Sequence, residues 1–245
     1  MALSPAPGMD VALHATESVR RRYPGLVGVV LFGSVARGEA VAGSDVDLLV
    51  IGEGDLPTRR SLMAGVPHGG GSNPLALAII ADEDFQGRLS HGDAFLEHVA
   101  DEGLVLWERE GRVTRALTTR KPPTRRQIRY QLDRELSKLS YFDDLSQFNG
   151  LFDLCCAQLF AIGKAVIILR LMLDGQKVFA RQAVFTELRR QHPELAKAIA
   201  HVVALEPYWA HASRHTSGYV SSAPATERTA RSALTAIREI GLVVP

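Results

Sequence analysis

The chain has 245 residues, of which 46% are hydrophobic and 22% are charged, and its 28 Lys and Arg nearly balance its 27 Asp and Glu. This composition excludes a chain that is disordered throughout and a fibrous repeat, and the formal charge of +1 disfavours coating of DNA by bulk charge. The length predicts one large domain or two small ones. The neighbouring Cys155 and Cys156 are poorly placed for a disulfide, which favours a reducing, cytoplasmic environment.

The first 110 residues alternate apolar runs with helical patterns. We expect a flexible N-terminus over 1–9 and an α/β (α+β) domain with a mixed sheet over 10–110, because strands and helices alternate along this part of the chain. The predicted elements are a helix over 11–22, strands over 26–32, 46–51, 75–80 and 104–106, a short helix over 58–64, a loop over 68–74, and one or two helices over 82–102.

After Pro122 and Pro123 only helical periodicity remains, which predicts an all-α helical bundle over 124–245. The predicted helices cover 125–148, 151–173, 182–190, 194–205 and 226–240. The most apolar of them, 151–173, is interrupted by charged and polar residues, so we expect a core helix and no membrane partner.

The segment 111–123 is predicted to be a basic linker between these domains. Seven basic residues and no acid lie within 112–129. Two interpretations stay open: contact with a triphosphate tail or an RNA backbone, or a solvated linker that runs into a basic helix start.

Two short segments carry the residues suited to chemistry. The segment 33–38 (GSVARG) follows the first predicted strand, and the segment 43–47 (GSDVD) leads into the second. Residues i and i+2 of a strand face the same side, so Asp45 and Asp47 project together. Paired carboxylates repel each other unless a cation lies between them, and Mg²⁺ prefers such oxygen ligands.

The residues of the first segment are suited to holding phosphate. Gly33 lets the main chain approach a ligand closely, and Ser34 follows at the expected start of a helix, where a hydroxyl and free N–H groups can hold an anion. Arg37, one turn further on, can add a charge-assisted contact. Together with the carboxylate pair, this pattern is typical of a site for a metal-bound nucleoside triphosphate.

These two segments resemble the signature of the polymerase-β-like nucleotidyltransferases, and their wording is similar to the minimal nucleotidyltransferases of bacteria and archaea. The resemblance implies that Gly33 and Ser34 hold the triphosphate and that Asp45 and Asp47 bind magnesium, with two ions when nucleotide is bound. We include Ser44 among the nucleotide-binding residues. The implied reaction transfers a nucleoside monophosphate to a hydroxyl of a small molecule, a protein or an RNA.

The helical remainder resembles the HEPN-type bundles and the helical domain of antibiotic nucleotidyltransferases. The family also has a third carboxylate on a later strand, but here Ala76 or Ala78 fills the expected position. The nearby acids at 82–84 are expected to open a helix instead. The alternative interpretation is therefore a catalytically weak or inactive module that binds nucleotide or a partner, of a toxin–antitoxin type. A homo-oligomer also stays open.

Overall fold

The structure is a computed structural model that describes residues 7–41, 43–63, 74–214 and 224–242. It divides into two compact units, unit 1 over Met1–Pro123 and unit 2 over Thr124–Pro245. Most of the segment predicted to be flexible, 1–9, and nearly all of the predicted loop over 68–74 lie outside the described residues.

Unit 1 is built on a four-stranded sheet in the order β3-β2-β1-β4. Its strands are β1 (Leu26–Phe32), β2 (Val46–Gly52), β3 (Leu75–Ala81) and β4 (Leu104–Glu108). β1 is antiparallel to both β2 and β4, whereas β2 and β3 are parallel. The mixed sheet predicted from the sequence is therefore confirmed, and each strand begins at its predicted residue.

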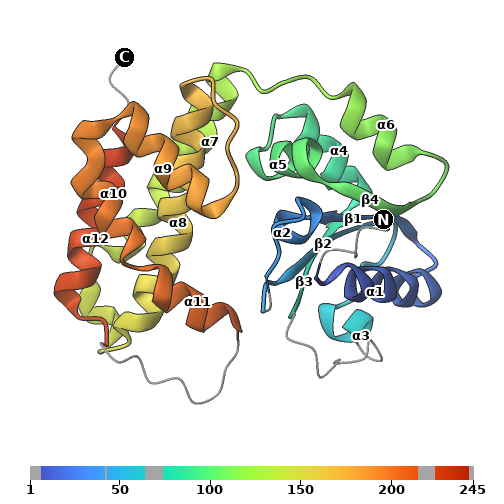
Figure 1. The fold of residues 1–245 in the computed structure, drawn as a ribbon, viewed down its shortest axis with the longest axis horizontal. Helices are drawn as coiled ribbons and strands as arrows, with labels where there is room; N and C mark the ends of the chain where they lie inside the picture. The colour runs from blue at the N-terminus through green and yellow to red at the C-terminus, as the bar shows by residue number, and fades with distance from the viewer. Residues whose placement is uncertain (1–6, 42, 64–73, 215–223, 243–245) are drawn as a thin grey trace, which may run out of the picture. The chain divides into compact units, whose positions relative to one another are not determined.

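Helices cover both faces of this sheet, as Figure 1 shows. Side chains of α1 (Met9–Arg22) and α3 (Arg59–Met63) pack on one face, against alternate residues of β2 such as Leu48. Side chains of three other helices pack on the opposite face, against Leu49 and Ile51. These helices are α4 (Asp82–Ser90), α5 (Ala94–Glu102) and α6 (Arg112–Thr119). A four-residue helix, α2 (Gly33–Ala36), follows β1 directly.

The segment predicted to be a basic linker, 111–123, instead contains α6 and belongs to unit 1. Val113 and Leu117, one helical turn apart, are buried in the core beneath the sheet. The basic side chains also have partners within the unit. Arg112 donates to Glu53 and Asp82, and Arg120 donates to Glu97 and Asp101. These contacts favour a structural role for much of the basic segment over an RNA-binding one.

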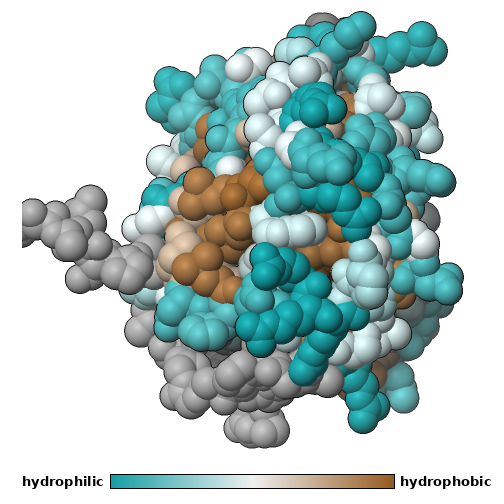
Figure 2. Space-filling model, turned by 90° about the vertical axis from the view of Figure 1, so that its right-hand side faces the viewer, coloured by the Kyte–Doolittle hydropathy of each residue, from teal (hydrophilic) through white to brown (hydrophobic). Residues whose placement is uncertain are grey.

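One side of unit 1 carries an apolar area framed by polar side chains (Figure 2). This view faces the side on which α1, β4 and α6 lie. Leu13 of α1 and Leu104 of β4 are 53% and 43% exposed. β4 is also an edge strand of the sheet among the described residues, so its outer edge has no strand partner there.

Unit 2 consists of helices among the described residues, as predicted (Figure 1). The α-helices are α7 (Arg125–Ser137), α8 (Phe152–Leu173), α9 (Arg181–Gln191), α10 (Ala196–Val203), α11 (Glu206–Arg214) and α12 (Glu227–Gly241). In the described part of this unit, three 3₁₀ helices lie between them: η1 (Lys138–Phe142), η2 (Leu145–Phe148) and η3 (Pro193–Leu195). The single helix predicted over 125–148 is wrong, because α7 ends at Ser137 and two 3₁₀ helices follow.

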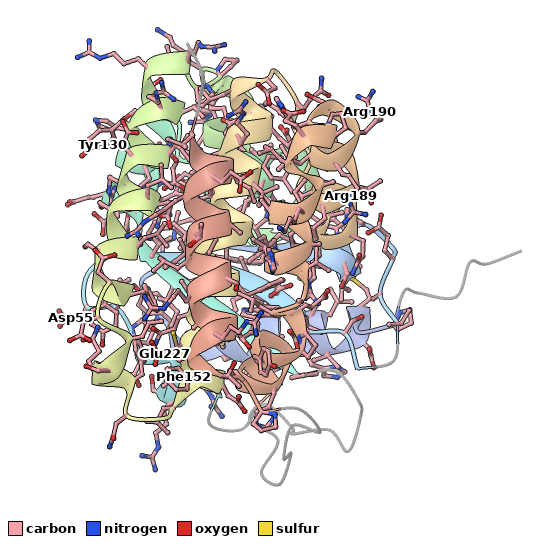
Figure 3. The ribbon with its side chains drawn as sticks, turned by 90° about the vertical axis from the view of Figure 1, so that its left-hand side faces the viewer. Asp55, Tyr130, Phe152, Arg189, Arg190 and Glu227 are labelled. Atoms are coloured by element: carbon pink, nitrogen blue, oxygen red, sulfur yellow. The ribbon has the colours of Figure 1, made fainter. Side chains whose placement is uncertain are left out.

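α8 is the core helix of this unit. By length and composition alone it could cross a membrane, but most of its side chains, including Phe160 and Ile167, are buried against the neighbouring helices. Tyr130 on α7 and Arg189 and Arg190 on α9 point away from the bundle (Figure 3). The polar outer faces and the apolar centre are what an amphipathic helical bundle requires.

Candidate functional site

The turn between β1 and α2 lies against the start of β2. Phe32, the last residue of β1, pairs with Asp47 across the antiparallel ladder. Gly33 then takes a φ of +75°, which L side chains rarely adopt, and a Cβ at this position would lie 2.5 Å from Oδ2 of Asp47. The glycine therefore allows both the turn and the close approach of the Asp47 carboxylate to the main chain.

Asp47 is the second residue of β2, whereas Asp45 lies one residue before the strand begins. Strand alternation therefore applies to Asp47 only, and the prediction that the two carboxylates project to the same side stays a prediction. Both are partly exposed, whereas Val46 between them is buried on the α1 side of the sheet. The alternation places Asp47 on the side that α5 covers, together with Leu49. Both carboxylates are thus accessible, and Asp47 lies next to Gly33.

The two serines predicted to bind nucleotide are both partly exposed. Ser34 is the second residue of α2, and its carbonyl oxygen accepts a hydrogen bond from Glu39 N at 2.9 Å. The Ser44 hydroxyl accepts a hydrogen bond from Val41 N at 2.9 Å, which closes the turn before β2. The structure thus places Ser34 in the turn beside Asp47 and gives Ser44 a local role in shaping the second segment.

Arg37 has protein partners. Its Nε donates to Glu39 Oε2 at 2.7 Å, and its Nη1 donates to Glu102 Oε2 at 2.5 Å. Burial lowers the pKa of Arg37, but the hydrogen bonds to both carboxylates outweigh this effect and leave the pKa above its ordinary value. His98 Nε2 donates to the same Glu102 oxygen at 2.9 Å. The predicted phosphate contact of Arg37 stays a prediction, since its charge is already paired.

The strand register locates the position of the third carboxylate. Asp47 pairs with Ala76 of the parallel strand β3, so these two side chains share a face of the sheet, and Ala78 lies one pleat further on. The end of β3 at Ala81 lies about 17 Å along the strand from Asp47, and the acid Asp82 begins α4 directly after it. It pairs with Arg112. The interpretation of 82–84 as the acidic first turn of a helix is therefore confirmed.

The contribution of α5 was not predicted from the sequence. Phe95, His98 and Glu102 lie three and four residues apart on one face of this helix, and all three contact the residues that flank α2. Their spacing indicated that the three side chains share one face of the helix. Nothing in the sequence indicated that this face contacts the residues flanking α2. Among the described residues, no group of three or more His, Cys, Asp or Glu could hold a metal ion.

Comparisons with known proteins show what this part of the chain is similar to. Residues 15–99 match a family model described as a nucleotidyltransferase domain, which includes both the 33–38 and the 43–47 segments. A search of curated protein sequences finds no match for the chain. The predicted resemblance of this part of unit 1 to nucleotidyltransferases is thereby confirmed.

Among solved structures, a spectinomycin adenyltransferase is similar in fold to this chain. The spectinomycin adenyltransferase AAD(9) from Enterococcus faecialis, solved with ATP and spectinomycin, is 11% identical with a TM-score of 0.53, and the match covers 94% of this chain and 99% of that one. A toxin–antitoxin structure with AMP-PNP is 17% identical with a TM-score of 0.34, covering 54% of this chain and 96% of that one. A nucleotidyltransferase-like protein from Exiguobacterium sibiricum is 16% identical with a TM-score of 0.35, covering 96% and 74%.

Proposed function

We propose that this chain, whose first unit carries a nucleotidyltransferase domain, transfers a nucleoside monophosphate from a nucleoside triphosphate to a hydroxyl acceptor. The observation that carries the proposal is the juxtaposition of Gly33 with Asp47, which sets a close-approach turn beside a carboxylate. In this reaction the acceptor oxygen forms a bond to the α-phosphorus, the bond between the α- and β-phosphates breaks, and pyrophosphate leaves.

The residues present fit magnesium. Asp45, just before β2, and Asp47, its second residue, offer hard carboxylate oxygens, and both are partly exposed. When bound there, magnesium would neutralise charge on the phosphates of the nucleotide. We further propose that Ser34 and the main-chain N–H groups after Gly33 hold the β- and γ-phosphates and so align the α-phosphate for attack.

We propose a small hydroxylated molecule as the acceptor class. The support is the likeness of fold to a spectinomycin adenyltransferase over nearly the whole of both chains, unit 2 included. The protein partners of Arg112 and Arg120 weaken the case for RNA as the acceptor. We also propose a cytoplasmic location, because the cysteines Cys155 and Cys156 are both free.

A second candidate is a module that binds nucleotide without transferring it. The observation that favours it is Ala76, which leaves the position beside Asp47 on β3 without a carboxylate. The acceptor oxygen would then lack a general base supplied by this strand.

A transfer assay separates the two candidates. The protein is incubated with each of the four α-³²P-labelled nucleoside triphosphates, magnesium, and panels of aminocyclitols, aminoglycosides, total tRNA or cell lysate. We expect label to reach a small-molecule acceptor with the wild-type chain, and the signal to be lost in Asp45→Asn and Asp47→Asn. Asp84→Asn is the matched control, because this exposed acid opens α4 at the far end of β3.

Label on tRNA or protein would overturn the small-molecule acceptor while keeping the transferase. Absence of transfer, with magnesium-dependent nucleotide binding still measured by calorimetry and lost in Asp47→Asn, would establish the binding module. Absence of both transfer and nucleotide binding would refute the proposed function.

A further inference from the structure

α2 is too short to hold its own geometry. It has four residues, and the hydrogen bond from Arg37 N to Gly33 O, at 3.2 Å, closes its single turn. A helix of this length is unstable in isolation, since nucleation fixes several residues for very few hydrogen bonds. The turn that carries Gly33 and Ser34 therefore depends on contacts from elsewhere in unit 1.

α5 supplies contacts at both ends of this turn. On the entry side, the ring of Phe32 meets Phe95 and His98 edge to face, with centroid distances of 5.3 and 5.8 Å. On the exit side, Glu102 accepts from Arg37 at 2.5 Å. All of these contacts come from one face of α5. This helix therefore fixes both the start and the end of α2.

These contacts are linked to one another. Glu102 Oε2 accepts hydrogen bonds from both Arg37 and His98, so the exit contact shares an atom with the residue that makes an entry contact. The side chains of Arg37 and Glu102 are each 18% exposed, and that of His98 is 17% exposed. Ion pairs shielded to this degree are held more firmly than exposed pairs, which contribute little.

We propose that His98 and Glu102 are positioning residues for the nucleotide phosphates, acting through Phe32 and Arg37 on the Gly33 turn. The inference rests on the proposed function, because it assigns these residues to the triphosphate side of that site. It also gives Arg37 a role different from phosphate contact: its guanidinium ties α2 to α5. The two roles of Arg37 make opposite predictions for the removal of Glu102.

The test is a double-mutant cycle on binding. Calorimetry measures the dissociation constants of magnesium with AMP-PNP and of magnesium with inorganic tripolyphosphate, which probes the phosphate site without a base. We expect Arg37→Ala and Glu102→Ala each to weaken binding about 10-fold. The double variant should bind no more weakly than either single variant, because each substitution already breaks the ion pair between Arg37 and Glu102. Independent contributions would instead multiply to about 100-fold. If Arg37 binds phosphate directly, Glu102→Ala releases its Nη1, while Glu39 still holds its Nε, and leaves binding unchanged or tighter.

Matched variants separate positioning from general loss of structure. Asp101→Ala removes an ion pair from the same helix, one residue away and directed at Arg120, and we expect unchanged binding. Glu102→Gln and His98→Phe are milder, since the first keeps an acceptor and the second keeps a ring beside Phe32, and we expect binding about 3-fold weaker for each. If Glu102→Ala fails to fold, these two milder variants still test whether His98 and Glu102 position the phosphate site.

Kinetics supply a further readout. Where transfer is observed, we expect the KM for nucleotide to rise in Glu102→Gln while kcat stays within about 2-fold, the pattern of a lost binding contribution. Two results would overturn the positioning role while leaving the proposed function intact. The first is that the wild-type chain binds and both milder variants bind equally well. The second is that the double variant of the cycle loses about 100-fold in binding. Failure of the wild-type chain to bind either ligand would instead count against the proposed function.

Discussion

Replacing Gly33 by alanine tests the geometry of the candidate site most directly. The backbone cost of placing alanine in the left-handed region, at the observed φ of +75°, is about 1–2 kcal/mol of folding free energy. In addition, the new Cβ would lie 2.5 Å from Asp47 Oδ2, so one of the two must withdraw by about 0.9 Å to reach an ordinary contact of 3.4 Å. A displacement near 1 Å at a reacting centre costs about 100-fold in rate.

Gly54→Ala is the control for the backbone cost. Gly54 has a φ of +70° in the same unit, and nothing lies within 4 Å of a Cβ built on it. We expect both variants to lose a similar free energy of unfolding, measured by urea titration, because both pay the same conformational cost. Nucleotide binding measured by calorimetry should weaken at least about 10-fold in Gly33→Ala only, since only that Cβ displaces the carboxylate. Equal binding by Gly33→Ala and the wild-type chain would refute the assignment of this turn to the nucleotide site.

Burial raises the pKa of the Cys156 thiol to about 12, so Ellman's reagent at pH 8 should leave the native protein unlabelled and react after unfolding in guanidinium; rapid native labelling would contradict this. Ala76→Asp adds a carboxylate beside the existing pair and should tighten Mn²⁺ binding, followed by electron paramagnetic resonance, about 10-fold, whereas Ala78→Asp, one pleat further, should not. The hydrogen bond from Arg112 lowers the pKa of Glu53 below 4.5. The stability from this pair is therefore present above pH 4.5 and is lost as the pH falls through the lowered folded-state pKa, and Glu53→Gln should flatten this part of the stability profile; an unchanged profile would rule the pair out as a source of acid sensitivity.

The strands and the first segment of the site could be predicted because their signals are local. Apolar runs bounded by glycine and proline marked β1 and β2, and the start of β2 placed Asp47 within the strand. The shared side of Asp45 and Asp47 stays a prediction, because Asp45 precedes the strand. α6 was missed, because its buried residues, Val113 and Leu117, are only two in number within a basic segment. Such a helix is stabilised by burial against the sheet, which a local pattern does not report.

The end of α7 shows a second kind of failure. Apolar residues continue at helical spacing past Ser137, so periodicity predicted one long helix. In the structure the Ser137 and Ser140 hydroxyls donate to the carbonyl oxygens of Arg134 and Ser137. Serine competes for the main-chain groups that an α-helix needs, and the chain passes into the 3₁₀ helix η1 at this point. The spacing of apolar residues gives no information about this competition, so it did not predict the end of α7.

The nucleotide side and the acceptor side of the proposed reaction differ in how far they can be predicted from the sequence. The residues suited to nucleotide lie within 33–47, where one turn and one strand suffice to bring Gly33 and Asp47 together. The helix that holds the turn lies much further along the chain, since Glu102 is 65 positions after its partner Arg37. This contact follows from the folded sheet and not from a local pattern. Acceptor choice has no comparable local pattern, because helical periodicity specifies packing and not a ligand. Variants of unit 1 can therefore be judged by binding alone, whereas the acceptor has to be found by varying the substrate.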